Sequence, residues 1–376
     1  MAISYLDCNA TTPIEPAVAK IIQKFMLEEY GNSGSRTHSY GSIAKKAVIT
    51  ARQQIASSVG VSSNEVIFTS GATEANNIAI LGLYAEGEKL GKRHIVSTQI
   101  EHKAVLEPLN ELQKRGWEIT LVPVAKDGVV DASQVIEAIR EDTLLVSIMH
   151  ANNETGILQP IEDISGMLLD KDVYFHTDAA QTFGKTPFHQ LDRVDLISIS
   201  SHKCYGPKGI GALIARRKEY VLPPIKPLIF GGGQERGLRP GTLPVPLIAG
   251  FGLAAEKAVK NMKAHEVFNT KLRQKVIAVI NTLGGVQNGM EELCLPHVLN
   301  VSIPGIDSEA AIVALKDIAA ISNGSACTSA SYTPSHVLQA MGFSQDRIDQ
   351  ALRISWSHLT VEPSWDEFSS ALSRTK

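Results

Sequence analysis

The sequence lacks the features that would place the protein in a membrane or in an oxidising compartment. Only four cysteines occur in 376 residues, they are widely separated, and none belongs to a C-x-x-C pair. This spacing argues against a disulfide framework and against a zinc site. No apolar run approaches the roughly 18 residues of a membrane-spanning helix, and the N-terminus has no basic stretch followed by an apolar core. We therefore expect a cytoplasmic protein with free thiols, no metal and no membrane contact.

An excess of charge of one sign is also missing. The chain has 36 basic and 39 acidic residues, which leave a formal net charge of −3. Such a balance creates no global field that would recruit nucleic acid, so we expect no direct contact with nucleic acid. The composition is that of an ordinary globular protein, and the length exceeds what a single hydrophobic core usually supports. The sequence thus predicts two closely packed domains.

Short apolar, β-branched runs alternate with helix-period stretches between about Thr12 and Arg217. This alternation is typical of crossover units around a parallel sheet, so the fold class is α/β with a mainly parallel seven-stranded sheet and flanking helices. One amphipathic helix is expected from Glu74 to Leu90. The expected strands are Glu65 to Thr69, His94 to Thr98, Ile119 to Val124, Leu144 to Met149, Val173 to Thr177, Leu196 to Ser200 and Gly211 to Arg216.

The second half of the chain begins with a stretch rich in proline and glycine, Leu222 to Pro246, which predicts a loop. A long helical stretch follows from about Leu247 to Leu283, and shorter strands and helices follow from Val298. We expect a large domain over residues 15–250. A smaller α+β domain would combine residues 1–14 with 251–376.

One lysine is unusually placed. Lys203 follows the apolar strand L-I-S-I-S and precedes the glycine-rich turn G-P-K-G-I-G. The carboxyl ends of strands are where α/β folds bind ligands, and a partly desolvated amine is suited to Schiff-base chemistry. The alternative is a solvated loop lysine, which the segment alone does not exclude.

Two further strand ends carry polar residues. Asp178 ends the apolar run from Val173, and a carboxylate is costly to bury without a partner. A protonated pyridine nitrogen is one candidate partner. The alternatives are a structural salt bridge and a helix N-cap. The segment from Thr69 to Thr73 ends another strand and opens a helix, where backbone N–H groups and Thr73 could hold a phosphate or simply cap the helix. Because the polar residues recur at equivalent strand ends, they indicate one site.

These segments, with others along the chain, resemble the class V aminotransferase family of pyridoxal-phosphate enzymes (fold type I), and within it the long-loop group of cysteine desulfurases. The resemblance runs nearly end to end. Its motifs here are Y-L-D-C-N-A-T-T-P, T-S-G-A-T-E, E-H-K, H-A-N-N-E-T-G, H-T-D-A-A-Q, S-S-H-K, G-P-K-G-I-G, G-G-G-Q-E-R-G-L-R-P-G-T and N-G-S-A-C-T-S-A.

The resemblance implies pyridoxal 5'-phosphate as the cofactor, L-cysteine as the substrate and a homodimer. Lys203 would carry the cofactor as a Schiff base and His102 would stack on its ring and move protons. Asp178 would pair with the ring nitrogen, and Gln181 would bond the ring hydroxyl. The remaining implied contacts are Ala72, Thr73, Ser200, His202 and, from the second subunit, Thr242 for the phosphate, Asn153 for cofactor or substrate, and Arg353 for the substrate carboxylate.

The resemblance also implies that Cys327 accepts the sulfur as a persulfide and passes it to an acceptor protein. Cys327 lies in a run of small polar residues that cannot pack a core, so an exposed loop in the small domain is expected. The other cysteines, Cys8, Cys204 and Cys294, match no family role. The acceptor would serve iron-sulfur cluster assembly or DNA phosphorothioation; the motifs around Cys8 and Cys327 most resemble the DNA-modification type, whose DNA contact would belong to partner proteins.

Three other functions fit parts of the pattern. Selenocysteine lysis and transamination of a small amino acid use the same scaffold, and Cys327 argues against transamination. A non-catalytic scaffold protein could keep the fold without the chemistry. Such a protein would be expected to lose Lys203, Asp178 or Cys327, and all three are present.

Overall fold

The structure is a computed structural model, which describes residues 3–188, 193–324 and 334–376. A seven-stranded sheet forms the centre of its larger part, in the order β2-β8-β7-β6-β5-β3-β4. Strands β4, β3, β5, β6 and β7 run parallel, whereas β8 is antiparallel to both β7 and β2. The predicted fold class is confirmed. The strands are β2 (Val66–Thr69), β3 (His94–Thr98), β4 (Glu118–Val122), β5 (Thr143–Ser147), β6 (Tyr174–Asp178), β7 (Leu196–Ser200) and β8 (Gly211–Ala215).

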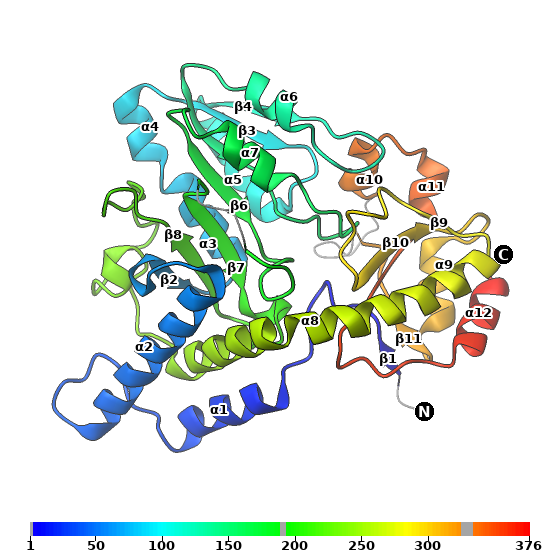
Figure 1. Ribbon diagram of the computed structural model, residues 1–376, viewed down its shortest axis with the longest axis horizontal. Coiled ribbons are helices and arrows are strands. Elements are labelled where there is room, and N and C mark those ends of the chain that lie inside the picture. Colours follow the sequence, from blue (N-terminus) through cyan, green and yellow to red (C-terminus); the bar gives the residue numbers. More distant parts are fainter. Residues whose placement is uncertain (1–2, 189–192, 325–333) are drawn as a thin grey trace.

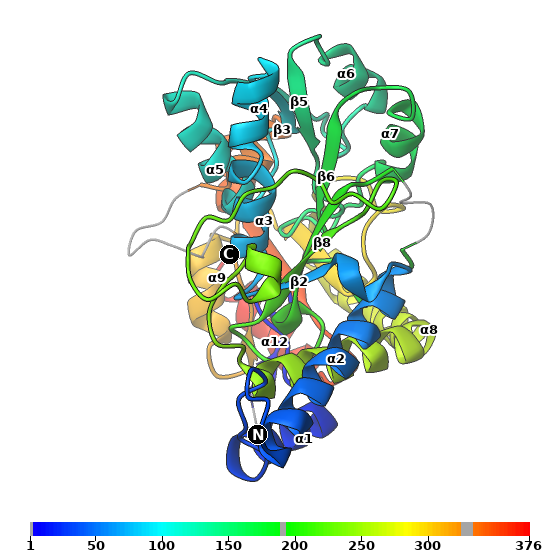
Figure 2. The ribbon, with the colours of Figure 1, turned by 90° about the vertical axis from the view of Figure 1, so that its left-hand side faces the viewer.

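Helices cover both faces of this sheet (Figures 1 and 2). Apolar side chains of α3 and α5 pack on one face, and those of α2, α7 and the first half of α8 pack on the other. Strands buried on both faces read as continuous apolar runs, which is why the sequence reveals them. The helices of this part are α1 (Pro16–Leu27), α2 (Ser39–Val59), α3 (Ala72–Leu81), α4 (Tyr84–Leu90), α5 (Lys103–Lys114), α6 (Ala132–Glu137), α7 (Ile161–Met167) and α8 (Val245–Thr282), with 3-10 turns at Ser63–Glu65, Ser201–Lys203 and Glu235–Gly237.

The single helix expected from Glu74 to Leu90 is wrong, because the chain forms α3 and α4 with a break at Gly82. The carbonyl of Gly82 accepts a hydrogen bond from the backbone N–H of Lys226, in the loop that follows β8. A Cβ atom at Gly82 would lie 2.3 Å from the carbonyl oxygen of Ile78, so only glycine fits this turn. The break depends on a tertiary contact, which helical periodicity does not reveal.

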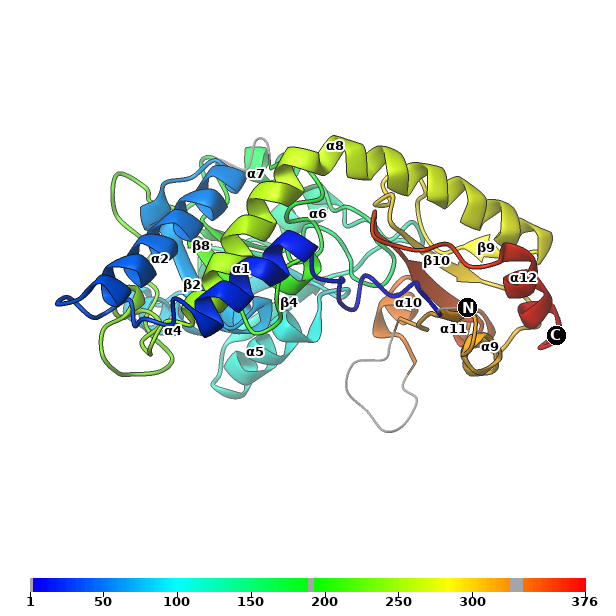
Figure 3. The same ribbon diagram turned by 90° about the horizontal axis from the view of Figure 1, so that it is seen from below.

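A smaller sheet and its helices form the rest of the molecule. Strand β10 (Val298–Ser302) pairs antiparallel with β12 (Ala351–Ser355) and β9 (Val286–Gln287), and β1 (Ser4–Tyr5) runs parallel to β11 (Ala319–Ala320). Helix α8 runs from the large sheet to this part (Figure 3). The other helices are α9 (Ser308–Leu315), α10 (His336–Ala340), α11 (Gln345–Asp349) and α12 (Trp365–Ser373). The expected domain boundaries at residues 14/15 and 250/251 stay a prediction.

No helix in the described ranges has the length and apolar character needed to cross a bilayer.

The fold brings polar residues from several elements together at the carboxyl edge of the large sheet. Strands β2, β6 and β7 end at this edge with Thr69, Asp178 and Ser200. The N-terminal segment reaches the same edge, where the backbone N–H of Thr12 donates to the carbonyl of His202. Asn9 of this segment and Arg353 of β12 both donate to the carbonyl of Asn153, in the loop after β5.

Candidate active site

A cavity of about 440 Å³ lies at the carboxyl edge of the large sheet. Its volume falls within the roughly 300–1,000 Å³ range of small-molecule sites in proteins. Most residues that the sequence predicted for the site line this cavity. They are Ala72, Thr73, His102, Asn153, Asp178, Gln181, Ser200, His202, Lys203 and Arg353.

Two predicted residues are placed differently. Thr242 is exposed and does not line the cavity of its own chain. Cys327 lies outside the described residues, so its predicted role as sulfur acceptor is carried by the sequence alone.

Lys203 ends the 3-10 turn that directly follows β7. Its Nζ donates hydrogen bonds to the backbone carbonyls of Asn9 and Ala10, the latter at 2.8 Å. The side chain is therefore held in the wall of the cavity and does not extend from a solvated loop. Carbonyl oxygens can only accept, so this position suits a protonated amine.

Asp178 ends β6 and is only 7% exposed. Its Oδ2 accepts a hydrogen bond of 2.7 Å from the Asn76 side chain, and its Oδ1 accepts one of 2.9 Å from the backbone N–H of Ala180. Among the described residues, no lysine, arginine or histidine lies within ion-pair distance of this carboxylate. A nearly buried carboxylate without a cationic side chain suits a positively charged ligand atom.

His102 forms the N-cap of α5, where its Nδ1 accepts a hydrogen bond of 3.0 Å from the backbone N–H of Ala104. This bond leaves the ring proton of the neutral imidazole on Nε2. Burial lowers the pKa of His102, and the opposing effect of Asp178 is partly cancelled by Lys203. His102 thus lines the cavity in an environment that favours the neutral imidazole, and the hydrogen bond at Nδ1 favours the tautomer with its proton on Nε2.

The amino end of α3 forms another wall of the cavity. Its N-cap, Gly71, makes no side-chain capping bond, and Ala72 and Thr73 begin the helix. Helix N-termini of this kind attract phosphate because their N–H groups point outward. Gly71 packs closely on Gly211: a Cβ atom added at Gly211 would lie 2.7 Å from the Cα of Gly71. Ser200 and His202 complete this wall.

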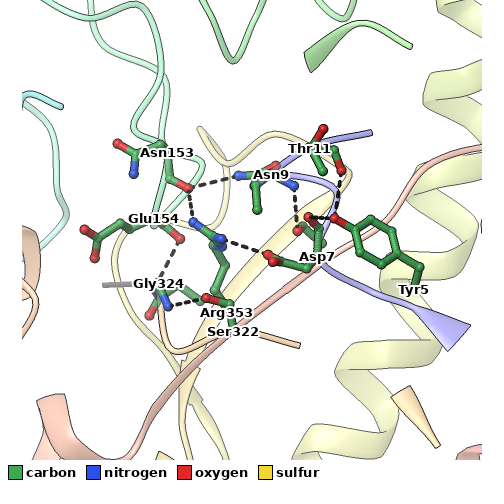
Figure 4. A network of polar contacts seen from close by, with 12 residues as sticks. Tyr5, Asp7, Asn9, Thr11, Asn153, Glu154, Ser322, Gly324 and Arg353 are labelled. Atoms are coloured by element: carbon green, nitrogen blue, oxygen red, sulfur yellow. Dashed lines mark hydrogen bonds and ion pairs between the residues drawn. The ribbon is translucent and has the colours of Figure 1, made fainter. Parts of the chain in front are cut away.

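Arg353 enters from β12 and is 3% exposed at its side chain. Its Nη2 donates to Asp7 Oδ1 at 2.8 Å, and its Nη1 donates to the carbonyl of Asn153 at 3.1 Å (Figure 4). Its Nε is buried and has no hydrogen-bond partner among the described residues. Arg353 is therefore a buried cation in the wall of the cavity, where it could pair with a carboxylate of a ligand.

Unsatisfied polar atoms indicate what the cavity accepts. Besides Arg353 Nε, the side-chain oxygens Asn9 Oδ1 and Gln181 Oε1 are buried without a partner in the described part of the chain. All three residues line the cavity. An unpaired buried polar group costs free energy, so each of these side chains would be stabilised if its atom turned toward a hydrogen-bonding ligand in the cavity. A ring with a cationic nitrogen, a phosphate and an amino-acid carboxylate fits this set of residues.

Several residues of the site were not predicted from sequence. Asn9, Ala10, Met149 and Lys208 line the cavity, and Asp7 contacts Arg353 behind it. Asp7 and Asn9 belong to the motif Y-L-D-C-N, but their partners are more than 100 residues away in the chain. Only that motif could have drawn attention to them.

Glu101, which precedes His102, gives a prediction on pH dependence. The Glu101 side chain is fully buried, and burial raises the pKa of its carboxyl to about 8. Its Oε1 accepts hydrogen bonds from Thr98 Oγ1 and from the backbone N–H of Met149, each at 2.8 Å. Between about pH 4.5 and 8 the unfolded chain releases a proton that the folded chain keeps, so this group makes stability fall as pH rises. Glu101→Gln keeps the acceptor and removes the titration. Its melting temperature should therefore fall less between pH 5 and 8 than that of the parent.

The control for this prediction is Glu107→Gln, on the exposed side of α5. It should melt with the pH dependence of the parent, as followed by circular dichroism at a series of pH values. A Glu101→Gln protein with the parent's slope would show that Glu101 does not hold its proton in the folded state.

Comparison with known proteins gives one family. The model of the class V aminotransferases matches residues 4–362. The cysteine desulfurase IscS of Pectobacterium carotovorum subsp. carotovorum (strain PC1) is 45% identical over 367 residues, which cover 96% of this chain and 90% of that protein.

Two solved structures are similar over the whole fold. A NifS-like protein superposes with a TM-score of 0.90 at 38% identity, covering 100% of this chain and 98% of the other. DndA from Streptomyces lividans superposes with a TM-score of 0.82 at 46% identity, covering 96% of this chain and 100% of the other.

Proposed function

Because the chain belongs to the class V aminotransferase family and is a cysteine desulfurase, we propose that its cavity binds pyridoxal 5'-phosphate together with L-cysteine. Enzymes of this family depend on that cofactor. The observation that carries the proposal is the convergence of Lys203, Asp178 and Arg353, from three separate elements, on one cavity. The direct test is the formation of alanine and sulfide from L-cysteine and a reductant by the purified, cofactor-loaded protein.

Each part of the cofactor has a matching group in the cavity. Lys203 would hold it covalently through Nζ, and Asp178 would face the ring nitrogen. The amino end of α3, with Ser200 and His202, would hold the phosphate. When bound, the cofactor supplies an electron sink next to the α-carbon of the substrate.

Protein groups also bind the substrate and handle its protons. The Arg353 guanidinium, which lines the cavity, would take the α-carboxylate of L-cysteine, with Asn153 beside it. The Lys203 amine, once released, is the base placed to remove the α-proton, and the carbonyls of Asn9 and Ala10 can hold it when protonated. The Nε2–H of His102 would donate a hydrogen bond to the sulfur of the substrate and so stabilise its thiolate.

Sulfur transfer is proposed to use Cys327. Its thiolate attacks the sulfur of bound cysteine, a sulfur-sulfur bond forms, and the carbon-sulfur bond breaks. The bonding electrons stay with the carbon, which takes up protons and leaves as alanine. The sum is one enzyme thiol and one cysteine giving one persulfide and one alanine, so no outside oxidant or reductant is needed.

A second copy of the chain is proposed to complete the phosphate site. Thr242 is exposed and lies away from the cavity of its own chain, which is consistent with a role in a partner's site. The segment that precedes it carries exposed apolar side chains, Leu228, Ile229 and Phe230, which would be covered in a homodimer.

The persulfide sulfur is proposed to pass to an acceptor protein. Similarity to IscS favours iron-sulfur cluster assembly, and similarity to DndA favours DNA phosphorothioation. With a net charge of −3 the chain itself is not expected to bind DNA. Loading the enzyme with radioactive sulfur from cysteine and identifying the labelled protein in a cell extract would decide between the two.

Asp178→Asn tests the pairing with the ring nitrogen. The substitution keeps the size of the side chain but removes its charge, and breaking a buried charge pair costs roughly 3–5 kcal/mol. We expect the rate of sulfide release to fall about a hundredfold or more, and the cofactor to be lost more readily on dialysis. A matched control is Asp195→Asn, at the opposite end of β7, where the carboxylate pairs with Arg193. Parent-like turnover and cofactor retention in Asp178→Asn would exclude the pairing.

A further inference from the structure

We infer that Asp7 is a positioning residue for substrate recognition, acting through Arg353. This inference rests on the proposed function, because it assigns to Arg353 the α-carboxylate of cysteine. Asp7 does not line the cavity; its Oδ1 lies behind Arg353, 2.8 Å from Nη2. Asp7 was part of a motif in the sequence, but nothing there gave it a role.

The backbone around Asp7 is fixed by β12, the strand that carries Arg353. The N–H of Ser355 donates to the carbonyl of Leu6 at 2.8 Å, and the N–H of Cys8 donates to the carbonyl of Ser355 at 3.0 Å. The hydroxyl of Tyr5 donates to the carbonyl of Asp7 at 3.0 Å. The carboxylate is thus held in place beside the guanidinium, as Figure 4 shows.

Asp7 and the carbonyl of Asn153 together fix the plane of the guanidinium. They occupy Nη2 and Nη1, while Nε is buried without a described partner. The planar fork of arginine recognises a carboxylate only when its donors are oriented toward it. Holding two nitrogens from behind lowers the entropy cost of that orientation before the substrate arrives.

The same segment continues to the cofactor lysine. The side-chain Nδ2 of Asn9 donates to the carbonyl of Asn153 at 3.1 Å, so this oxygen accepts hydrogen bonds from both Asn9 and Arg353. The carbonyls of Asn9 and Ala10 then accept from Lys203. Residues 7–10 therefore contact both Arg353, which would bind the substrate carboxylate, and Lys203, which would act on the adjacent α-carbon.

Asp7→Asn in the cofactor-loaded enzyme is the test. The amide keeps the shape of the side chain and can still accept from Nη2, but it removes the negative charge that pairs with the guanidinium. We expect KM for L-cysteine to rise about tenfold, with kcat within about twofold, and the absorbance of the bound cofactor to be unchanged. Binding of the product L-alanine, followed by its effect on that absorbance, should weaken by the same factor. Asp195→Asn, which alters an equivalent Asp–Arg pair away from the cavity, should leave both values as in the parent.

A double-mutant cycle separates positioning from general stability. If Asp7 acts through Arg353, Asp7→Asn should add nothing to the loss of L-alanine binding already caused by Arg353→Ala. Asp7→Glu, which retains the carboxylate, should recover part of the affinity, and its melting temperature reports whether the fold is intact. An unchanged or lower KM in Asp7→Asn, or additive losses in the double variant, would overturn the inference. If Arg353→Ala itself binds L-alanine normally, the proposed role of Arg353 fails instead.

Discussion

Replacing Lys203 by alanine is expected to abolish desulfuration, lowering the rate by at least roughly a thousandfold. The structure places its Nζ in the cavity wall, held by the carbonyls of Asn9 and Ala10. In the proposed function this amine both holds the cofactor covalently and removes the α-proton, so its loss removes two contributions at once. The variant should also lack the yellow absorbance of covalently bound cofactor, which is measured on the purified protein.

Two variants make this experiment specific. Lys203→Arg keeps a positive charge and hydrogen-bond donors for the two carbonyls but cannot hold the cofactor covalently, so it should be as inactive as Lys203→Ala. Lys226→Ala, which removes an exposed lysine from the loop after β8, should behave as the parent. A Lys203→Ala protein whose cofactor is still fixed to the chain by borohydride would place the covalent bond on another lysine.

Cys327→Ser is expected to have the second large effect, a fall in sulfide release from L-cysteine of about a hundredfold or more. A serine hydroxyl is a far weaker nucleophile toward sulfur than a thiolate. The residues that line the cavity are unchanged, so the cofactor absorbance should stay as in the parent. Sulfide released in the presence of a reductant is the quantity to measure.

The other cysteines provide the control. The thiol of Cys294 donates a hydrogen bond to the carbonyl of Thr155, and burial raises its pKa, which disfavours the reactive thiolate. Cys294→Ser should therefore release sulfide at the rate of the parent. Full sulfide release by Cys327→Ser would show that the sulfur leaves without a persulfide on this residue.

Local pattern was sufficient for the large sheet and for the residues at its strand ends. Short uncharged runs such as L-I-S-I-S are buried at every position, so the sequence shows where these strands lie. Asp178 could be recognised because it ends such a run, and Lys203 because it follows the end of another after one short turn. Parallel strands bring these ends to one edge, which is why residues far apart in the sequence share a cavity.

Tertiary contacts explain what local pattern missed. The break at Gly82 depends on a hydrogen bond from Lys226, and the pairing of Asp7 with Arg353 joins residues 346 positions apart. Neither changes the periodicity of its own segment. Arg353 itself was identified through the family motif, because a buried arginine in a short strand has no local signature of carboxylate binding.

The proposed function depends most on the transfer of sulfur from L-cysteine to Cys327. The most direct measurement is the mass of the Cys327 peptide after the cofactor-loaded enzyme has reacted with one equivalent of L-cysteine without reductant. We expect a Cys327 peptide heavier by one sulfur atom, with an equal amount of alanine formed. Alanine formed while Cys327 stays unmodified, or sulfur found on Cys8, Cys204 or Cys294 instead, would contradict it.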